Sequence, residues 1–361
     1  SAFLDNVTTV LLIVPVTIAI ARQLEMSPLP FLITEIIASN IGGTATLIGD
    51  PPNIMIGSAT GLGFMDFILN LTPVIVVIYV LTIFSLQLLY RKSLIARPEL
   101  QANIMKINEQ ETIKDAPLLR KCLIVLSLTV LGFILHQYID LESSVIALSG
   151  ASLLLLVTRR DPEHALHAVE WPVIFFFIGL FVVVGALKEV GVIEVVARWA
   201  LDVTGGSIVP TGMLILWLSA IASAFVDNIP FVATMIPLIQ DMGQLGGIAD
   251  LNLFWWSLSL GACLGGNGTI VGASANVVVI GIADKMGMHI SFIEFMKVAF
   301  PLMLLSIFIS TSYLLFWYYF HTMTAMSVTL AFGVILGLLL KMVKAKIIYK
   351  PAAKSTTGSE N

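Results

Sequence analysis

Long apolar stretches, separated by short polar segments, run along the chain. Several are long enough, or nearly long enough, to cross a bilayer as helices, because a spanning helix needs about 20 apolar residues. They lie at about 73–90, 119–139, 141–158, 171–187, 299–320 and 328–340. The pattern predicts an all-α polytopic membrane protein.

Three further apolar stretches are interrupted by polar or glycine-rich segments. Residues 31–58 are broken by NIGGTATLIGDPPN, and residues 254–282 by LGGNGTIVGASAN. Because glycine tolerates backbone conformations closed to other residues, we expect one helix to end and a second to begin within each of these two stretches. Residues 207–239 carry DNIP at their centre, which predicts two short helices meeting at a polar tip.

The interrupted stretches belong to an internal repeat. SAFLDN at the start of the chain returns as SAFVDN at Ser223–Asn228. Five positions of the first break match five positions of the second at one constant offset. The first break contributes Gly42, Gly43, Thr46, Gly49 and Asn53, and their counterparts in the second are, in the same order, Gly265, Gly266, Thr269, Gly272 and Asn276. An odd number of predicted crossings separates equivalent points, so we expect the two copies to have opposite orientations. Inverted repeats with interrupted helices are typical of secondary transporters.

Composition and charge support the membrane assignment. Hydrophobic residues make up 58% of the chain and charged residues 12%, which excludes a soluble globular protein. Lys and Arg gather at 91–121, 159–160 and 341–354, and an even number of crossings must separate these segments if all are cytoplasmic. That requirement favours a re-entrant hairpin at Asp227, with its tip buried in protein or lining a wet cavity. We expect a bacterial or archaeal inner (cell) membrane protein with a cytoplasmic C-terminus.

The expected domain organisation follows the repeat. Residues 1–90 form the first copy, 91–118 a cytoplasmic loop, 119–320 the second copy, 321–345 an extra C-terminal membrane helix and 346–361 a cytoplasmic tail. The pattern at 191–203 fits either a helix along the membrane surface or an exposed helix extension. About a hundred residues precede SAFVDN within the second copy and none precede SAFLDN, so we expect the chain to lack roughly that many N-terminal residues.

The two ends of each break differ in chemistry. Carbonyls left free where a half-helix ends at NIGGT carry partial negative charge and suit a cation or a proton-bearing group. At GDPPN, we expect Asp50 to cap the second half-helix and Pro51 or Pro52 to fill its first turn. Free amides at that helix start suit an anion. Ala273 and Ser274 replace Asp50 and Pro51 in the second copy, so the charge is asymmetric.

The other intramembrane acidic residues each have two interpretations. Asp5 and Asp227 are expected to cap the helices that follow them, and a capping carboxylate inside a membrane can also bind an ion. Glu35 lies within an apolar helix and is either a proton-coupling group or a structural glutamate with a satisfied partner. Asp66 and Glu294 occupy matched positions after the breaks, where we expect helix caps.

The predicted ion-binding site combines the hairpin tips with the two breaks. Its residues are Asp5, Asn6, Asn40, Gly42, Gly43, Thr44, Asp50, Asn53, Asp227, Asn228, Gly265, Gly266, Asn267, Thr269 and Asn276. The two cysteines and five histidines lack metal-ligand spacing, so no metal, cofactor or catalytic residue is predicted. The chain carries no nucleotide-binding loop or nucleophile elbow, which argues against an ATP-driven pump and an intramembrane enzyme. No nucleic-acid partner is expected.

Four segments resemble a known transporter superfamily. SAFLDNVTTVLLIVPVTI, EIIASNIGGTATLIGDPPNIMIGS, SAFVDNIPFVATMIPLI and LGACLGGNGTIVGASANVVVIGIA are similar to the branch of the ion transporter superfamily that holds arsenite permeases, sodium/proton antiporters and P-protein-like permeases. The P-protein-like permeases are nearest, and the resemblance covers nearly all of residues 1–320. It implies an inverted-repeat fold, a homodimer, and a moving transport domain built from hairpins and broken helices beside a scaffold domain.

The resemblance also bears on the substrate. In the relatives that carry dicarboxylate and sodium, Ser-Asn-Thr at the hairpin tips binds these ligands, whereas the tips here read DNV and DNI. This difference favours small inorganic ions and proton coupling. We expect an alternating-access secondary transporter for a small anion or metalloid oxyanion, such as arsenite, coupled to protons or sodium. A sodium/proton antiporter, an ion channel and a sodium-coupled dicarboxylate transporter are the alternatives.

Overall fold

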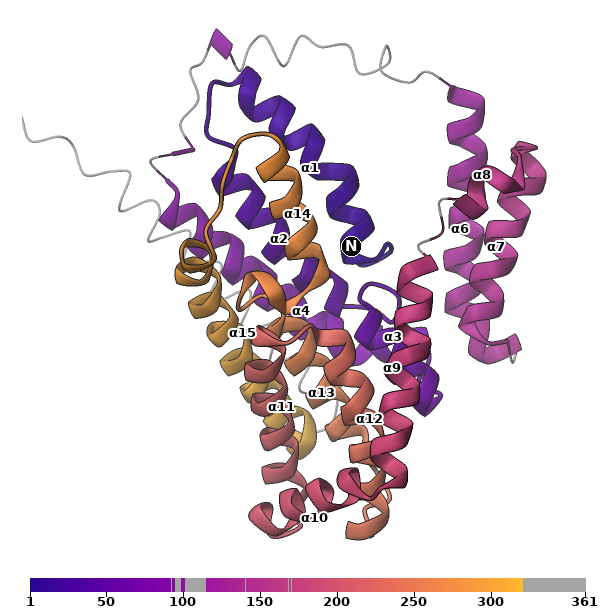
Figure 1. The fold of residues 1–361 in the computed structure, drawn as a ribbon, viewed down its shortest axis with the longest axis vertical. Coiled ribbons are helices and arrows are strands. Elements are labelled where there is room, and N and C mark those ends of the chain that lie inside the picture. The colour runs from indigo at the N-terminus through magenta and orange to yellow at the C-terminus, as the bar shows by residue number, and fades with distance from the viewer. Residues whose placement is uncertain are drawn as a thin grey trace, which may run out of the picture.

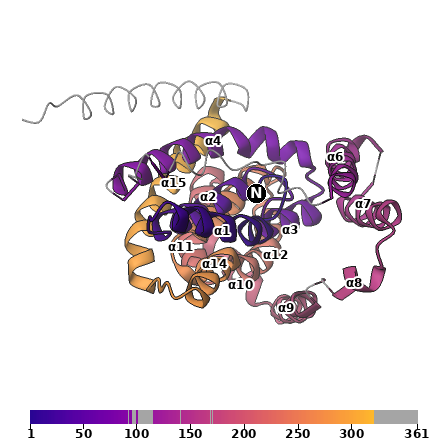
Figure 2. The same cartoon turned by 90° about the horizontal axis from the view of Figure 1, so that it is seen from above.

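The structure is a computed structural model that describes residues 1–91, 93–94, 99–100, 115–139, 141–167, 169 and 171–320. Within these ranges the chain forms α-helices and one short 3-10 helix, and no strand. The predicted all-α class is confirmed. Most helices gather in one elongated body (Figure 1), and the helices of residues 116–167 stand to one side of it when the molecule is seen from above (Figure 2).

The first copy of the repeat places a broken helix between two unbroken ones. Its helices are α1 (Asn6–Gln23), α2 (Leu29–Thr44), α3 (Pro51–Thr60) and α4 (Phe64–Leu89). The break between α2 and α3 falls within the segment predicted from its glycines and prolines. Pro51 and Pro52 form the first turn of α3, where their fixed backbone angle fits and no amide hydrogen is needed.

In the described part of the chain, further helices precede this order in the second copy. Those are α6 (Ala116–Ile139), α7 (Ser143–Thr158), α8 (Pro162–His167), α9 (Trp171–Glu189) and α10 (Val192–Thr204). The rest are α11 (Ile208–Phe225), α12 (Asn228–Gly246), α13 (Asn252–Gly265), the 3-10 helix η2 (Ile270–Gly272), α14 (Ser274–Lys285) and α15 (Phe292–Phe320). Only Val226 and Asp227 separate α11 from α12, so the two helices predicted to meet at DNIP are present.

The helices α4 and α15 begin earlier than their hydropathy predicted. The apolar stretches started at Pro73 and Ala299, yet the helices begin at Phe64 and Phe292. Pro73 therefore lies inside α4, and Pro301 lies inside α15. Membrane helices tolerate interior proline because neighbouring groups satisfy the freed backbone atoms, so a proline is a poor marker of a helix start here.

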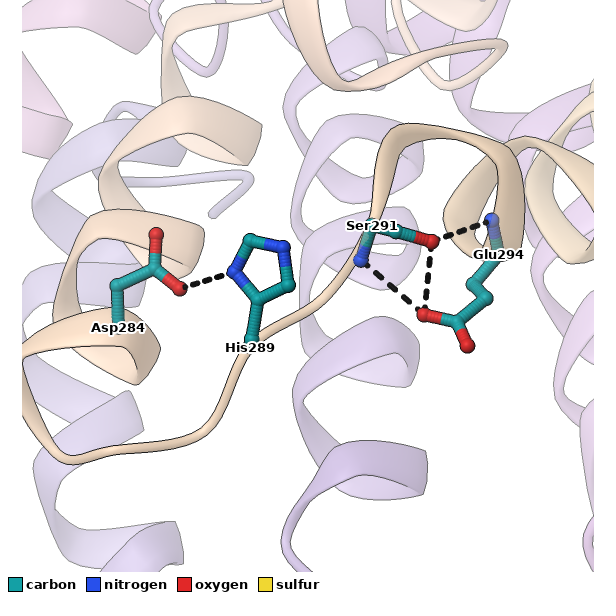
Figure 3. A network of polar contacts seen from close by, with 4 residues as sticks. All are labelled: Asp284, His289, Ser291 and Glu294. Carbon is teal, nitrogen blue, oxygen red and sulfur yellow. Dashed lines mark hydrogen bonds and ion pairs between the residues drawn. The ribbon is translucent and has the colours of Figure 1, made fainter.

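Acidic caps set these earlier starts. The Asp66 carboxylate accepts a hydrogen bond from the backbone N–H of Gly63 at 2.8 Å, three residues before it. At the start of α15, the Glu294 carboxylate accepts from the Ser291 N–H at 3.2 Å and from its hydroxyl at 2.8 Å (Figure 3). Each carboxylate satisfies an amide group that the start of its helix leaves unpaired, and at α15 the Ser291 hydroxyl accepts the Glu294 N–H in return. The predicted capping roles of Asp66 and Glu294 are confirmed.

Six helices in the described part of the chain are long and apolar enough to cross a membrane. They are α1, α4, α6 up to His136, α9, α11 and α15, with α7 as a shorter apolar helix. Helices α6, α7 and α9 expose large apolar side chains over much of their surface, as expected for contact with lipid. The re-entrant turn at Asp227 and the opposite orientation of the two copies stay predictions. The helix expected at 321–345 lies outside the described residues.

Equivalent helices pack in equivalent ways in the two copies. Helix α1 packs against α2 of its own copy and α14 of the other, just as α12 packs against α13 and α3. The first half-helices α2 and α13 also contact each other. Each copy therefore contributes packing surfaces to the broken helix of the other, which brings the two breaks together inside the protein.

Helix α10 is the amphipathic helix expected at 191–203. Its buried residues include Ile193, Ala197 and Ala200, and it packs chiefly against α12. Figure 1 shows it lying across the ends of α11 and α12. Its position at a membrane surface stays a prediction.

Candidate functional site

Paired glycines allow each break to fold back on itself. A Cβ atom added to Gly43 would lie 2.5 Å from the carbonyl oxygen of Gly49. A Cβ added to Gly266 would lie 2.9 Å from the carbonyl oxygen of Gly272. Because real Cβ atoms do not approach oxygen this closely, only glycine fits these positions. The spacing shared by the two copies in the sequence thus reflects the same backbone crossing in each break.

One asparagine holds each break closed. The side-chain amide of Asn53 donates to the carbonyl oxygens of Thr44 at 3.1 Å and Thr46 at 2.9 Å. The amide of Asn276 donates to the carbonyls of Gly266 and Thr269, each at 2.8 Å. These bonds satisfy carbonyls that the interrupted helix leaves without partners. Both donor hydrogens of Asn53 and of Asn276 are therefore engaged within the protein.

The two breaks are connected by side chains that cross from one copy to the other. The amide of Asn40 on α2 donates to the side-chain oxygens of Asn276 at 2.9 Å and Asn267 at 3.0 Å. The hydroxyl of Ser259 on α13 donates to the side-chain oxygen of Asn53 at 2.6 Å. The side-chain nitrogen and the side-chain oxygen of Asn53 and of Asn276 are thus all hydrogen-bonded within the protein. Both residues are therefore positioning residues in this conformation.

The tip before α1 joins the same network. The amide of Asn6, the first residue of α1, donates to the side-chain oxygen of Asn40 at 3.0 Å. Asp5 accepts the backbone N–H of Thr8 at 2.9 Å and also accepts its hydroxyl. Its predicted role as the cap of α1 is confirmed.

The tip before α12 is capped in the same way. The Asp227 carboxylate accepts the backbone N–H of Ile229 at 3.0 Å, which confirms the predicted cap. Its second oxygen accepts the hydroxyl of Ser274 at 3.0 Å, at the start of α14. Asp227 therefore links the hairpin tip of the second copy to the second half-helix of that copy.

Asp50 occupies the capping position of α3, but its side chain makes no capping bond, contrary to our expectation. The reason is local: Pro51 and Pro52 have no amide hydrogen, and the N–H of Asn53 bonds to the backbone oxygen of Asp50 at 3.0 Å. The Asp50 carboxyl is fully buried, and one oxygen accepts a long bond of 3.5 Å from the amide of Asn228. Its other oxygen is buried and accepts no well-aligned hydrogen bond, and the Cys263 thiol on α13 interacts with the carboxyl.

The charged side chains that act on Asp50 are both acidic. Asp5 and Asp227 lie near enough to act on it, and both carry charge of the same sign. The described residues include no buried Lys or Arg, and no ion pair found among them involves Asp50. An ionised carboxylate in such surroundings is strongly unfavourable unless a proton or cation neutralises it.

The amide cluster itself is closed to solvent in this conformation. Residues from both tips and both breaks are buried, namely Asn6, Asn40, Thr44, Asn53, Asn228, Asn267, Thr269 and Asn276. All of them belong to the site predicted from the sequence, and the structure brings them together. Gly42 and Gly265 serve close packing, since an added Cβ would lie 3.2 Å from the Ser1 hydroxyl and 2.6 Å from the Ala220 carbonyl.

Glu35 stands apart from this network. One carboxylate oxygen accepts the hydroxyl of Thr17 on α1, and the other is buried without a partner. Its hydrogen bond thus joins α2 to α1 and does not reach the asparagine cluster. Both interpretations of Glu35, as a proton-coupling group and as a structural residue, stay open.

Cys263 and Ser259 are site residues that the sequence interpretation missed. The Cys263 sulfur lies 3.6 Å from the side-chain oxygen of Asn53 and beside the Asp50 carboxyl. The signal was present in the repeat, because the offset that matches the two breaks also aligns Cys263 with Asn40.

A family profile and several known proteins that are similar to this chain carry names that describe a transporter or a membrane protein. The sequence profile of the CitMHS family, described as "Citrate transporter", matches residues 1–261. A protein of Mycobacterium tuberculosis named an uncharacterized transporter is 45% identical over 315 residues, covering 87% of this chain and 73% of its own. A "46 kDa membrane protein" of Mycobacterium leprae is 42% identical with the same coverage.

The resemblance to P-protein-like permeases is confirmed. The P protein of Homo sapiens is 35% identical over 395 residues, covering 87% of this chain and 47% of the P protein. A family profile that matches well over half of the chain, together with a relative of 45% identity, shows the family. The chain therefore belongs to the CitMHS citrate transporter family and is a membrane transporter, not an enzyme.

Proposed function

We propose that this chain is a proton-coupled secondary transporter of a small anion or oxyanion, with Asp50 as the group that binds the coupling proton. The observation that carries the proposal is the fully buried Asp50 carboxyl, for which the described part of the chain offers no buried Lys or Arg as a partner. Intramembrane ionisable residues of this kind mark ion pathways and proton relays. Alternating access would expose Asp50 to one side of the membrane and then to the other.

The groups around Asp50 favour a proton over sodium. A proton needs one oxygen, whereas a sodium ion needs several oxygen ligands. Asn228 presents its amide N–H to Asp50, which is a donor and cannot coordinate a cation. The side-chain oxygen of Asn53 is occupied by Ser259. The binding of sodium would require these amides to rearrange, while a proton is accommodated as they stand.

Helix starts around the site support an anionic or oxygen-rich substrate. Helices α1, α3, α12 and α14 begin at Asn6, Pro51, Asn228 and Ser274, which are the tips and the ends of the breaks. The positive end of the helix dipole at each of these starts favours negative charge, whereas Asp5 and Asp227 already accept amide hydrogens of α1 and α12, and α3 begins with two prolines. With acidic side chains nearby and no buried Lys or Arg among the described residues, a substrate of low charge, such as arsenite, suits the site better than free citrate.

A sodium/proton antiporter is the second candidate. Asp5, Asp50 and Asp227 interact electrostatically in a region without basic side chains, and such carboxylates could bind sodium and protons in turn. The antiporter would move protons when sodium is added and would not move arsenite, citrate or chloride. The two candidates therefore differ in which solute accompanies the proton.

The proposal is tested by flux into proteoliposomes under an imposed pH gradient. Arsenite, citrate, chloride and sodium are supplied one at a time to the wild-type protein. We expect uptake of one anion or oxyanion to depend on the pH gradient, and Asp50→Asn to lose that dependence because an amide cannot be protonated in this range. Asp202→Asn, at an exposed position on α10, should behave like the wild type. Uptake by the wild-type protein that does not depend on the pH gradient would contradict the proposal. An unchanged pH dependence in Asp50→Asn would also contradict it.

A further inference from the structure

The start of α4 is capped by a histidine from another helix. The backbone N–H of Phe64, the first residue of α4, donates to the Nε2 atom of His136 on α6 at 3.2 Å. This N–H is one of the amide groups that the first turn of a helix leaves without a partner. Beside the bond, the ring of Phe64 stacks on the ring of Phe133, with centroids 6.1 Å apart. His136 therefore fastens α6 to the helix that follows the first break.

These contacts define one protonation state of His136. Because the Phe64 N–H is a donor, Nε2 is the unprotonated nitrogen, and the ring hydrogen lies on Nδ1. The Nδ1 atom lies 3.3 Å from the carbonyl oxygen of Leu141, which accepts this hydrogen. The Leu141 N–H in turn donates to the backbone carbonyl of His136 at 3.2 Å. The neutral ring thus connects the start of α4 with the turn between α6 and α7.

Protonation would break one of these two ring contacts and keep the other. An imidazolium ring carries a hydrogen on both nitrogens, so Nε2 would face the Phe64 N–H as a second donor. The helix dipole also opposes a positive charge at the start of α4. The bond to Leu141 uses the hydrogen on Nδ1 and survives. The loss therefore falls on the link between α6 and α4.

A cavity beside His136 offers space for the ring once it has left α4. The cavity has a volume of about 430 Å³, and residues 54–62 of α3 and the segment after it line one side of it. The other side is lined by His136 and by residues 141–144, at the turn between α6 and α7. Glu142 is among these residues, so the cavity wall carries a carboxylate that suits a positively charged ring.

The charged groups that neighbouring elements place around His136 are acidic in the described structure. Glu142 precedes α7 and is exposed, and Asp66 lies in the first turn of α4. Helix α3 carries no charged residue. Asp66 accepts the backbone N–H of Gly63 at 2.8 Å, which holds it at the helix start. Glu142 is therefore the carboxylate that shares the cavity with His136.

We propose that His136 is a pH-sensitive clasp between the pair α6–α7 and the first copy of the repeat. The neutral ring holds α6 against the start of α4, and a ring that takes a proton from water releases α4 and turns toward Glu142. Helix α6 packs chiefly against α7 and α4, and the pair stands to one side of the body (Figure 2). Release therefore loosens a contact that attaches the pair to the body. Histidine side chains change charge between about pH 8 and 5, so the clasp responds within this range.

The test measures the distance between two spin labels by electron paramagnetic resonance, on the whole chain in liposomes. The labels are attached at Ala59→Cys on α3 and Ala147→Cys on α7, two exposed positions on either side of the contact. Cys122→Ser removes a partly exposed thiol, and Cys263 is buried. We expect one short distance at about pH 8 and the loss of that population, in favour of longer distances, at about pH 5.

Substitutions assign the change to His136. In His136→Gln the side-chain oxygen can accept the Phe64 N–H but cannot gain a proton, so the short distance should persist at both pH values. His289→Gln replaces an exposed histidine that contacts Asp284, and it should behave like the wild type. The labels report the contact without any transport, so the result does not depend on proton coupling at Asp50. Equal wild-type distances at both pH values, or a His136→Gln variant that opens in acid as the wild type does, would overturn the inference.

Discussion

Asp227 combines two tasks in one carboxylate. One oxygen caps α12 through the Ile229 N–H, and the other accepts the Ser274 hydroxyl at the start of α14. An asparagine at this position keeps an acceptor for the cap but loses the negative charge and one acceptor oxygen. The structural and the functional contributions of Asp227 can therefore be separated by a single substitution.

We predict that Asp227→Asn abolishes coupled flux while the protein still inserts and purifies normally. The retained cap should hold the loss of stability to about 1 kcal/mol, typical of one exchanged hydrogen bond. Flux in proteoliposomes and thermal unfolding in detergent measure the two effects on the same preparation. Wild-type flux in Asp227→Asn would reduce the residue to a helix cap.

Individual site residues were predictable where the repeat identified them, and unpredictable where their partners decide their role. The constant offset between the two copies selected Asn53 and Asn276, and both hold the breaks closed. The hydrogen bonds that their side-chain oxygens accept from the opposite copy depend on packing between α2 and α13. That packing cannot be predicted from a local sequence pattern. Cys263 was missed because an isolated cysteine in an apolar helix is usually an inert core residue.

The broken helices depend on close contact between backbone segments. A Cβ added to Gly272 would lie 2.7 Å from two carbonyl oxygens, those of Gly266 and Ser223. These contacts join the break of the second copy to the hairpin arm α11. A methyl group there would force the two backbones apart, and unlike a flexible side chain they have little freedom to yield.

We predict that Gly272→Ala destabilises the protein by about 1–3 kcal/mol, the usual effect of inserting a methyl group into a packed interior. Gly281→Ala is the matched control, since Gly281 lies within α14 and an added Cβ meets nothing within 4 Å. The control should be neutral or slightly stabilising because alanine favours helix. Thermal unfolding in detergent compares the two, and equal midpoints would show that the close crossing is not required.

Helix existence was predictable from hydropathy, whereas helix starts were not. Glycine and proline in NIGGTATLIGDPPN identified the first break, and DNIP identified the turn between α11 and α12. The starts of α4 and α15 were wrong because they depend on caps at Asp66 and Glu294, which lie in less apolar sequence. Asp50 also occupied the expected capping position, but two prolines removed the amide groups that it would have capped.

The whole molecule contains a repeated core with an asymmetric centre. Helices α1–α3 and α12–α14 make matching contacts, each with the other copy as well as its own. The carboxyl of Asp50 has no counterpart in the second copy, where Ala273 stands. A symmetric scaffold with one buried carboxyl at its centre suits alternating access, because the same group can face either side as the helices rearrange.

Proton coupling acts in both directions, so it can also be measured without imposing a pH gradient. If the solute and the proton move together, a solute gradient alone must drive proton movement. Proteoliposomes that enclose a pH-sensitive dye receive an inward gradient of the anion or oxyanion found to be transported. We predict that the interior acidifies in step with solute entry for the wild type, and that Asp50→Asn shows no pH change. Solute entry without any change of internal pH in the wild-type protein would contradict the proposed coupling at Asp50.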